Sequence, residues 1–399
     1  MISSRSIYRI LVLLLLAGGI VLCVVRWKAW FANPEEPRWE GDTIAYKFHT
    51  FSEETLDGFI KYEGEHSAVW QDLRVPDTLS FLLLGDVHNG IDSLHWDAIA
   101  RRHPNLDFYA QLGDFIERGY FYYEQQLVSE LEGTPLEQLP IICTPGNHEY
   151  RKGIVRRLPE LWYNVFPQPQ NGPERFKGTT YYVDFPDLRF IVIDTNGLQR
   201  LSDYTIVNTW VRKVLQEAGD RFTVVMMHHP VFSASIGRQN PLINLTFRRV
   251  LKDADIVFAG HDHNYARRLP FIVTNSAQKF YLNKVNPKDT RICSGRQLYN
   301  VVSVIRHTPQ GALPSTQYDT LMVETRLLET GELYDLVKVV HQPDTAQANA
   351  AEPLMLIRTY LEPMNNSPEI IDMPDKYKGK SSRKVQRFLQ RRADRLAQE

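Results

Sequence analysis

The chain has 399 residues, of which 43% are hydrophobic and 23% are charged, and its formal net charge at pH 7 is −1. This ordinary globular composition excludes a largely disordered chain and leaves room for one large domain with extensions. The near-zero net charge gives the whole molecule no electrostatic footprint for nucleic acid.

An apolar segment stands near the N-terminus. Residues 10–25 form an uncharged stretch, ILVLLLLAGGIVLCVV, with Arg9 before it and Arg26 after it. We interpret residues 1–32 as a single membrane-anchoring helix, because the flanking basic and tryptophan side chains suit a membrane interface. A cleaved signal peptide is the alternative, although bulky and charged residues stand where a small-residue cleavage site is needed. The distribution of basic residues favours an extracytoplasmic catalytic domain, which is periplasmic if the source is bacterial.

Residues 33–78 are polar and contain several prolines, so we interpret them as a linker and lead-in segment. Within them, residues 43–51 alternate in polarity and predict a strand at a sheet edge. From residue 79 onward, apolar runs alternate with polar motifs and amphipathic stretches. The helices predicted by this pattern cover residues 94–102, 121–131 and 154–166. The alternation predicts an α/β layered domain over residues 79–342.

Further strands are predicted towards the C-terminus. Residues 179–185 and 188–195 read as a hairpin, which makes the sheet mixed. Three more apolar runs suit a second sheet packed on the first; they cover residues 297–305, 319–328 and 333–340. Residues 343–399 form a C-terminal extension, of which 376–399 carry nine lysine or arginine residues against two acidic ones. This stretch predicts a basic amphipathic helix that either contacts anionic lipid or docks on its own domain.

Five short motifs carry six of the twelve histidines. They are GDVHN (85–89), GDFIERG (113–119), GNHE (146–149), HHP (228–230) and GHDH (260–263). Each motif follows an apolar run that predicts a buried strand, and ligands in open α/β sheets bind beyond the carboxyl ends of strands. Imidazole combined with hard oxygen donors suits Zn, Mn or Fe. The motifs therefore predict a metal centre where five strand ends meet at one edge.

In this order, the five motifs resemble the signatures of the calcineurin-like metallophosphoesterase superfamily, roughly from residue 79 to residue 268. The resemblance implies a four-layer α/β/β/α sandwich of two mixed β-sheets flanked by helices. It also implies two divalent metal ions, whose identity as Mn, Zn or Fe stays open. The implied ligands are Asp86, His88, Asp114 and His263 for one ion, and Asp114, Asn147, His228 and His261 for the other.

The same resemblance implies roles for residues beside the ligands. His148 follows Asn147 directly and is the implied proton donor to the leaving oxygen. Arg118 matches an arginine that grips a phosphate oxygen in protein-phosphatase members, although an ordinary surface arginine is the alternative. His229 is expected to lie behind the ligands or face the substrate, and its assignment could be exchanged with that of His228.

The overall pattern is closest to purple-acid-phosphatase-like members, with two departures: purple members lack the first-motif histidine that His88 supplies, and they differ in the second motif. Purple members carry a tyrosine three residues after the motif aspartate, and this chain has Glu117 there. We therefore expect no tyrosinate absorption band and a divalent or mixed iron pair. Glu117 is assigned to the surroundings of the metals, and whether it touches one stays open.

The function implied by the resemblance is that of a metal-dependent phosphoric ester hydrolase. A metal-bridging hydroxide would attack a phosphomonoester or a phosphodiester, two classes that the motifs do not separate. Substrate selectivity is expected in the loops at 151–179 and 232–245. The rival hypothesis is a membrane-tethered scaffold with a vestigial metal site. The sequence leaves two further points open: the oligomeric state, and whether Cys143 and Cys293 form a disulfide or stay free thiols.

Overall fold

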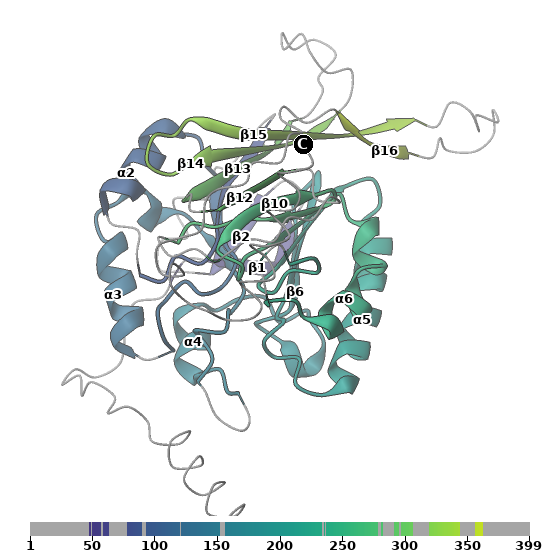
Figure 1. The fold of residues 1–399 in the computed structure, drawn as a ribbon, viewed down its shortest axis with the longest axis horizontal. Coiled ribbons are helices and arrows are strands. Elements are labelled where there is room, and N and C mark those ends of the chain that lie inside the picture. The colour runs from purple at the N-terminus through teal and green to yellow at the C-terminus, as the bar shows by residue number, and fades with distance from the viewer. Residues whose placement is uncertain are drawn as a thin grey trace, which may run out of the picture.

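Two seven-stranded β-sheets face each other, with helices outside both of them (Figure 1). The computed structural model describes residues 48, 50–56, 59–63, 78–89, 93–119, 121–151, 156–233, 235, 237–277, 281, 291–294, 297–305, 319–343 and 356–361. A separate two-stranded sheet pairs β1 (Thr50–Leu56) with β2 (Phe59–Glu63) in antiparallel fashion.

The first large sheet is mixed. Its strands, in order across the sheet, are β16 (Leu356–Leu361), β15 (Leu333–Pro343), β14 (Thr320–Leu327), β13 (Leu298–Ile305), β3 (Thr78–Leu84), β4 (Phe108–Gln111) and β5 (Ile141–Cys143). The strands β3, β4 and β5 run parallel to one another. The remaining pairings, from β3 through β13 to β16, are antiparallel.

The second large sheet is mixed as well. Its strands, in order, are β12 (Arg291–Ser294), β10 (Asn264–Arg268), β11 (Phe271–Val273), β9 (Ile256–Ala259), β8 (Phe222–Met227), β7 (Leu188–Ile193) and β6 (Tyr181–Asp184). The block from β11 through β9 and β8 to β7 is parallel. The β6–β7 pair is antiparallel, so the hairpin predicted over 179–195 is present.

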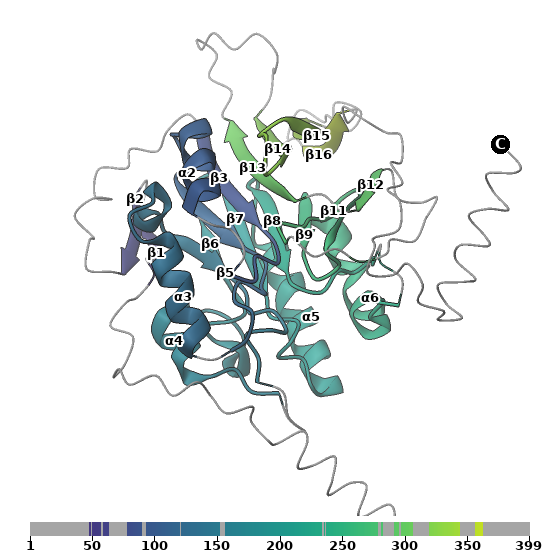
Figure 2. The ribbon, with the colours of Figure 1, turned by 60° about the vertical axis from the view of Figure 1, so that its left-hand side comes forward.

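Helices cover the outer face of each sheet (Figure 2). Those beside the first sheet are α2 (Ser93–Arg102), α3 (Phe121–Leu131), α4 (Glu160–Val165) and the 3₁₀ turn η2 (Pro135–Gln138). Those beside the second sheet are α5 (Leu201–Gln216), α6 (Pro241–Phe247) and the 3₁₀ turn η4 (Val250–Asp253). A third 3₁₀ turn, η3 (Glu174–Phe176), precedes β6.

Alternate residues of the central strands enter different apolar clusters. On β3, Phe81 and Leu83 belong to the core between the sheets, whereas Leu82 and Leu84 pack with Trp96 beneath the helices. On β8, Met226 faces the inner core and Met227 packs in the outer cluster that also contains Val211 of α5. Both faces of β3 and β8 therefore pack against apolar clusters, which explains why the sequences of these two strands are largely unbroken apolar runs. The predicted four-layer α/β/β/α sandwich is confirmed.

The division of strands between the sheets differs from the prediction. We expected the runs after residue 297 to form a second sheet on their own, but β13, β14 and β15 join β3 in the first sheet. The five motif strands are also divided: β3, β4 and β5 lie in the first sheet, while β8 and β9 lie in the second. Strand pairing is a long-range choice, and periodicity within a run carries no information about the partner.

Two local predictions need correction. The helix expected over 154–166 is shorter, since α4 begins at Glu160 after Pro159, whose backbone is extended. Proline disfavours helical backbone in the residue before it, so the helix starts only after this position. Of the strand expected over 43–51, the structure describes residues 48, 50 and 51; Thr50 and Phe51 belong to β1, which pairs with β2 rather than with the edge of a large sheet.

Several predicted features lie outside the described residues. These are the anchor at 1–32, most of the linker at 33–78, and most of the C-terminal extension at 343–399 with its basic helix at 376–399. Within the described ranges, no helix has both the length and the apolar character needed to span a bilayer. Cys143 is a free, buried thiol. The strand β16 was not predicted, and it extends the first sheet beyond β15.

Candidate metal centre

The predicted ligands follow strands of both sheets. Asp86 and His88 come after β3, Asp114 after β4 and Asn147 after β5. His228 comes after β8, and His261 and His263 come after β9. Groups from the two sheets approach each other closely, for example His263 Nε2 and Asp86 Oδ1 at 3.6 Å. The centre is thus built across two sheets and not along the edge of one.

The backbone at these strand ends is unusual. Among the described residues, the non-glycine residues with positive φ are Asp86, His88, Asn89, Asp114, His261 and His263, with φ between 49° and 68°. All of these except Asn89 are predicted ligands. L-residues adopt this conformation at a cost, and such strain concentrates where function requires a side chain to be redirected. The left-handed turns let neighbouring positions within one short loop aim side chains at the same point.

Two glycines allow the second and third motif loops to touch. Gly113 has φ of 87°, and a Cβ there would lie 2.5 Å from the backbone nitrogen of Gly146. A Cβ on Gly146 would lie 2.2 Å from both the backbone nitrogen and Oδ1 of Asp114. A side chain at Gly146 would therefore displace Asp114, and one at Gly113 would push the third motif loop away.

The first predicted ligand set is gathered around the Asp114 carboxylate. Ligand atoms of Asp86, His88, Asp114 and His263 all lie within 4.8 Å of one another. The Nε2 atoms of His88 and His263 are 3.2 Å apart, and His88 Nε2 lies 3.8 Å from Asp114 Oδ2. Two imidazole nitrogens facing each other beside two carboxylates form a donor set that suits one divalent cation.

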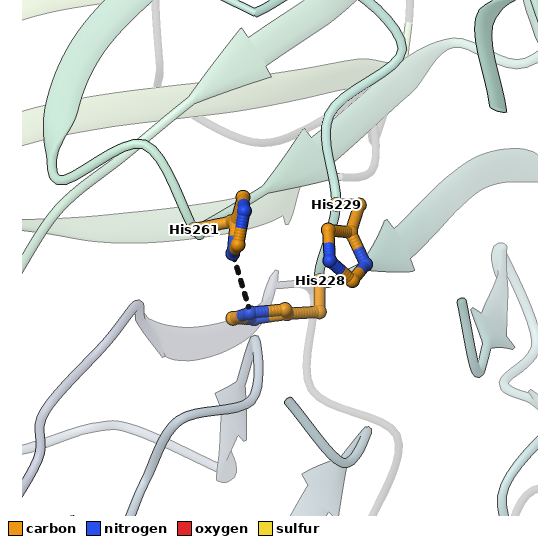
Figure 3. Close-up of side chains that lie close together, drawn as sticks. All are labelled: His228, His229 and His261. Carbon is orange, nitrogen blue, oxygen red and sulfur yellow. Dashed lines mark hydrogen bonds between the residues drawn. The ribbon is translucent and has the colours of Figure 1, made fainter. Parts of the chain in front are cut away.

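The second set meets the other side of the same carboxylate. His228 Nε2 lies 3.4 Å from Asp114 Oδ2, 3.3 Å from Asn147 Oδ1 and 3.1 Å from His261 Nδ1. Figure 3 shows the rings of His228 and His261 joined by this contact, with His229 beside them. The other nitrogen of His228 lies 2.9 Å from the carbonyl oxygen of Leu112, which accepts its proton and directs Nε2 to the centre.

The charge balance of the centre also fits cation binding. Burial alone would lower the pKa of His228, but the carboxylates of Asp114 and Asp86 raise it to about 9. Burial raises the pKa of Asp86 to about 7, although His228 opposes this effect. A cation that binds His228 Nε2 would therefore compete with a proton for that atom.

His148 lies next to the first ligand set. Its Nε2 is 4.0 Å from Asp114 Oδ2, and its ring packs edge-on against the ring of His88. Its Nδ1 lies 2.5 Å from the carbonyl oxygen of Glu117. The side chain of Glu117 reaches His88, with Oε2 3.2 Å from Nδ1. Glu117 thus contacts His148 through its main chain and His88 through its side chain.

The remaining predicted residues differ in position. His229 lies with His228 and His261 in a group whose nitrogen atoms fall within 4.8 Å of one another, and its Nδ1 is 2.9 Å from the hydroxyl of Thr195. Burial, and to a smaller extent the charge of His228, holds the pKa of His229 well below its ordinary value. Arg118 is exposed, and in the part of the chain that the structure describes it makes no ion pair with the centre.

Sequence reasoning missed a carboxylate that braces the loops. Glu149 is buried, and its side chain accepts hydrogen bonds from the backbone N–H groups of Asp114, Phe115, Ile116 and Gly146 at 2.5–3.1 Å. Burial, and to a smaller extent the charge of Asp114, raises the pKa of this carboxyl to about 7. Its place in the GNHE motif was the available signal.

Glu149→Gln is expected to destabilise the metal-free protein by about 2 kcal/mol or more, because glutamine has one acceptor oxygen where the carboxyl has two, and a buried N–H group that loses its acceptor costs about 1–3 kcal/mol. The amide nitrogen of glutamine would also face an N–H donor. Urea unfolding measures the change, and Glu132→Gln, at an exposed position, is the control. A change within about 0.5 kcal/mol, typical of surface substitutions, would contradict the bracing role.

The fold and the centre together define the class of protein. A sandwich of two mixed sheets, with Asp, Asn and His side chains gathered at strand ends, is the arrangement that the motifs predicted for a metallophosphoesterase. Residues 79–265 match the sequence model of a family described as calcineurin-like phosphoesterase. These residues form a calcineurin-like phosphoesterase domain, and the predicted superfamily is confirmed.

Two named relatives show how far the likeness extends. The glycerophosphodiester phosphodiesterase GpdQ of Enterobacter lignolyticus (strain SCF1) is 27% identical over 133 residues, which cover 31% of this chain and 45% of that protein. The purple acid phosphatase PPD1 from yellow lupin (Lupinus luteus) seeds is 16% identical with a TM-score of 0.52, covering 66% of this chain and 54% of that chain. At that identity the structural likeness concerns the fold. The chain spans about half the length of these relatives.

Proposed function

We propose that this chain is a phosphoric ester hydrolase that uses two divalent cations. The observation that carries the proposal is the position of Asp114, whose Oδ2 lies 3.8 Å from His88 Nε2 and 3.4 Å from His228 Nε2. One carboxylate between two groups of nitrogen and oxygen donors is what a pair of cations about 3.5–4 Å apart requires. Asp86, His88 and His263 would complete one site, and Asn147, His228 and His261 the other.

When bound, the cations would acidify a water molecule and neutralise charge on the phosphoryl group. The protein's own groups supply the rest of the chemistry. His148 stands beside Asp114 with its Nδ1 held by the Glu117 carbonyl oxygen, so Nε2 is free of that contact and can carry the proton for the leaving oxygen. Asp114 Oδ1 accepts the backbone N–H of His148, which ties the proton donor to the bridging carboxylate.

A metal and substrate screen tests the proposal. Protein supplemented with Mn, Zn or Fe is assayed with nitrophenyl phosphate, a monoester, and with bis-nitrophenyl phosphate, a diester, while the metal content per chain is measured. We expect two cations per chain and hydrolysis of at least one substrate. The named relative supports including glycerophosphodiesters in the screen. Absence of both metal and hydrolysis would refute the proposal and favour the scaffold hypothesis.

The cellular location is a separate proposal that rests on sequence. The apolar stretch at residues 10–25 and its flanking charges support anchoring by residues 1–32, with the catalytic domain outside the cytoplasm. Fractionation of cells that express the full chain, with protease added to intact cells or spheroplasts, tests both points. Recovery in the cytoplasmic fraction would contradict them.

A further inference from the structure

Arg238 lies against the metal centre, although nothing in the sequence singled it out. It belongs to the 232–245 loop after β8, where substrate selectivity was expected. Its Nη2 lies 2.8 Å from His261 Nε2 and 3.0 Å from His261 Nδ1. The side chain is 23% exposed, so the guanidinium is largely withdrawn from solvent at this position.

The loop that carries Arg238 is fastened to the loop that carries the histidines. Asp262, between His261 and His263, accepts hydrogen bonds from the Ser233 hydroxyl at 2.7 Å and the Ser235 N–H at 3.2 Å. Ser235 in turn donates its hydroxyl proton to the carbonyl oxygen of Asp262 at 2.8 Å. The two loops are therefore fixed to each other beside the centre.

The guanidinium itself has two lateral supports. Its Nε lies 3.8 Å from Asp262 Oδ1, and its central carbon lies 4.2 Å from the centre of the Tyr281 ring. The Tyr281 ring also packs against the ring of His263. An arginine held by a carboxylate and by an aromatic face keeps its terminal nitrogens available to a third partner.

Once a cation is bound to His261, that histidine can no longer be the third partner of Arg238. A neutral imidazole has one proton and one lone pair, so a cation on either nitrogen leaves the proton on the other. Nη2 would then face an N–H donor, and a second positive charge would lie on the same ring. Arg238 must give up this contact on metal loading, and an anionic oxygen is the partner that restores its hydrogen bonds.

We propose that Arg238 binds the phosphoryl group of the substrate, the role that the resemblance to protein-phosphatase members implied for Arg118. The inference rests on the proposed function, since it concerns the metal-loaded centre. Arg238 contacts a predicted ligand directly, whereas Arg118 is exposed. The planar guanidinium matches two phosphoryl oxygens, so the group bound is a phosphate or phosphate ester at the cations.

Calorimetric titration of Mn²⁺ and of inorganic phosphate tests the proposal. Arg238→Gln is expected to weaken phosphate binding to the Mn²⁺-loaded protein by roughly 10–100-fold, as a lost hydrogen bond to a charged group implies. The same variant should bind Mn²⁺ more tightly than the wild type, because a competing positive charge next to His261 is removed. Opposite changes in the two affinities distinguish this role from a structural one, which would weaken both.

The control is Arg212→Gln, which removes an exposed arginine on α5, outside the 232–245 segment, and should change neither affinity. If Arg238→Gln is poorly folded, Arg238→Lys retains the charge without the planar fork and should still lose part of the phosphate affinity. Phosphate binding that is unchanged in both variants would overturn the proposal. Loss of phosphate affinity in Arg118→Gln alone would return the role to Arg118. A wild type that binds no Mn²⁺ would instead refute the proposed function.

Discussion

Asp114→Asn should remove both cations from the centre in a single substitution. Asparagine preserves the shape of the side chain and the Oδ1 acceptor for the His148 N–H, but it removes the negative charge between the two donor groups. Replacing a group that only supports a metal ligand lowers the metal affinity by about 10–100-fold. Replacing a ligand that both cations share should therefore lower the affinity for each cation by more than about 100-fold. Hydrolysis should fall with metal occupancy. The measurement is metal content per chain after equilibration with a chelator of known affinity.

Asn147→Ala serves as the comparison for Asp114→Asn. Asn147 Oδ1 contacts His228 Nε2 at 3.3 Å and belongs to the second donor group alone. This variant should weaken one cation and leave the other near its wild-type affinity. If Asp114→Asn also lost only one cation, Asp114 would not be the bridging ligand.

His148→Ala should leave the metal content near normal and reduce turnover by about 10²–10⁴-fold, the usual contribution of a positioned acid. The reduction should depend on the leaving group. An alkyl phosphate, whose alkoxide leaves poorly, needs the proton more than nitrophenyl phosphate does. His103→Gln, on a histidine whose Nε2 contacts the Tyr299 hydroxyl, is the control and should retain full activity. Equal rates for wild type and His148→Ala on both substrates would refute the assignment.

The pH profile of the same variant supplies an independent check. Burial lowers the pKa of His148, and the charge of Asp114 only partly opposes this effect. Because this pKa is lowered, His148 becomes largely protonated only at pH values below the ordinary imidazole pKa. Turnover of the alkyl substrate should decline as pH rises through this range, and His148→Ala should lose that limb of the profile.

Much of the fold could be predicted from sequence because the relevant signals are local. The motif strands are buried on both faces and flank polar loops, so their apolar runs were recognisable, and α3 coincides with the predicted 121–131 helix. The failure at 154–166 arose from giving helical periodicity more weight than Pro159. The sheet assignment of β13–β15 could not be predicted, since β13 pairs with β3, more than 200 residues earlier, while β14 and β15 join the sheet through β13.

In the candidate centre, too, local features could be predicted from the sequence and long-range contacts could not. Asp86, His88, Asp114, Asn147, His228, His261 and His263 were named from short motifs, and the structure brings their donor atoms together. Glu149 belongs to the GNHE motif, but the sequence did not predict which groups its side chain would contact. Its partners are backbone N–H groups of the second and third motif loops, which a linear pattern cannot assign to a side chain.

The sequence by itself determined which residue types follow each buried strand, and therefore the class of chemistry at the strand ends. It did so because apolar runs, glycine turns and metal-binding side chains lie within a few positions of one another in the sequence. Only the tertiary structure decided that the five motif strands divide between two sheets, that Arg118 is exposed, and that Arg238 contacts His261. Those outcomes depend on packing between segments far apart in the chain, where local propensity has no influence on the choice of neighbour.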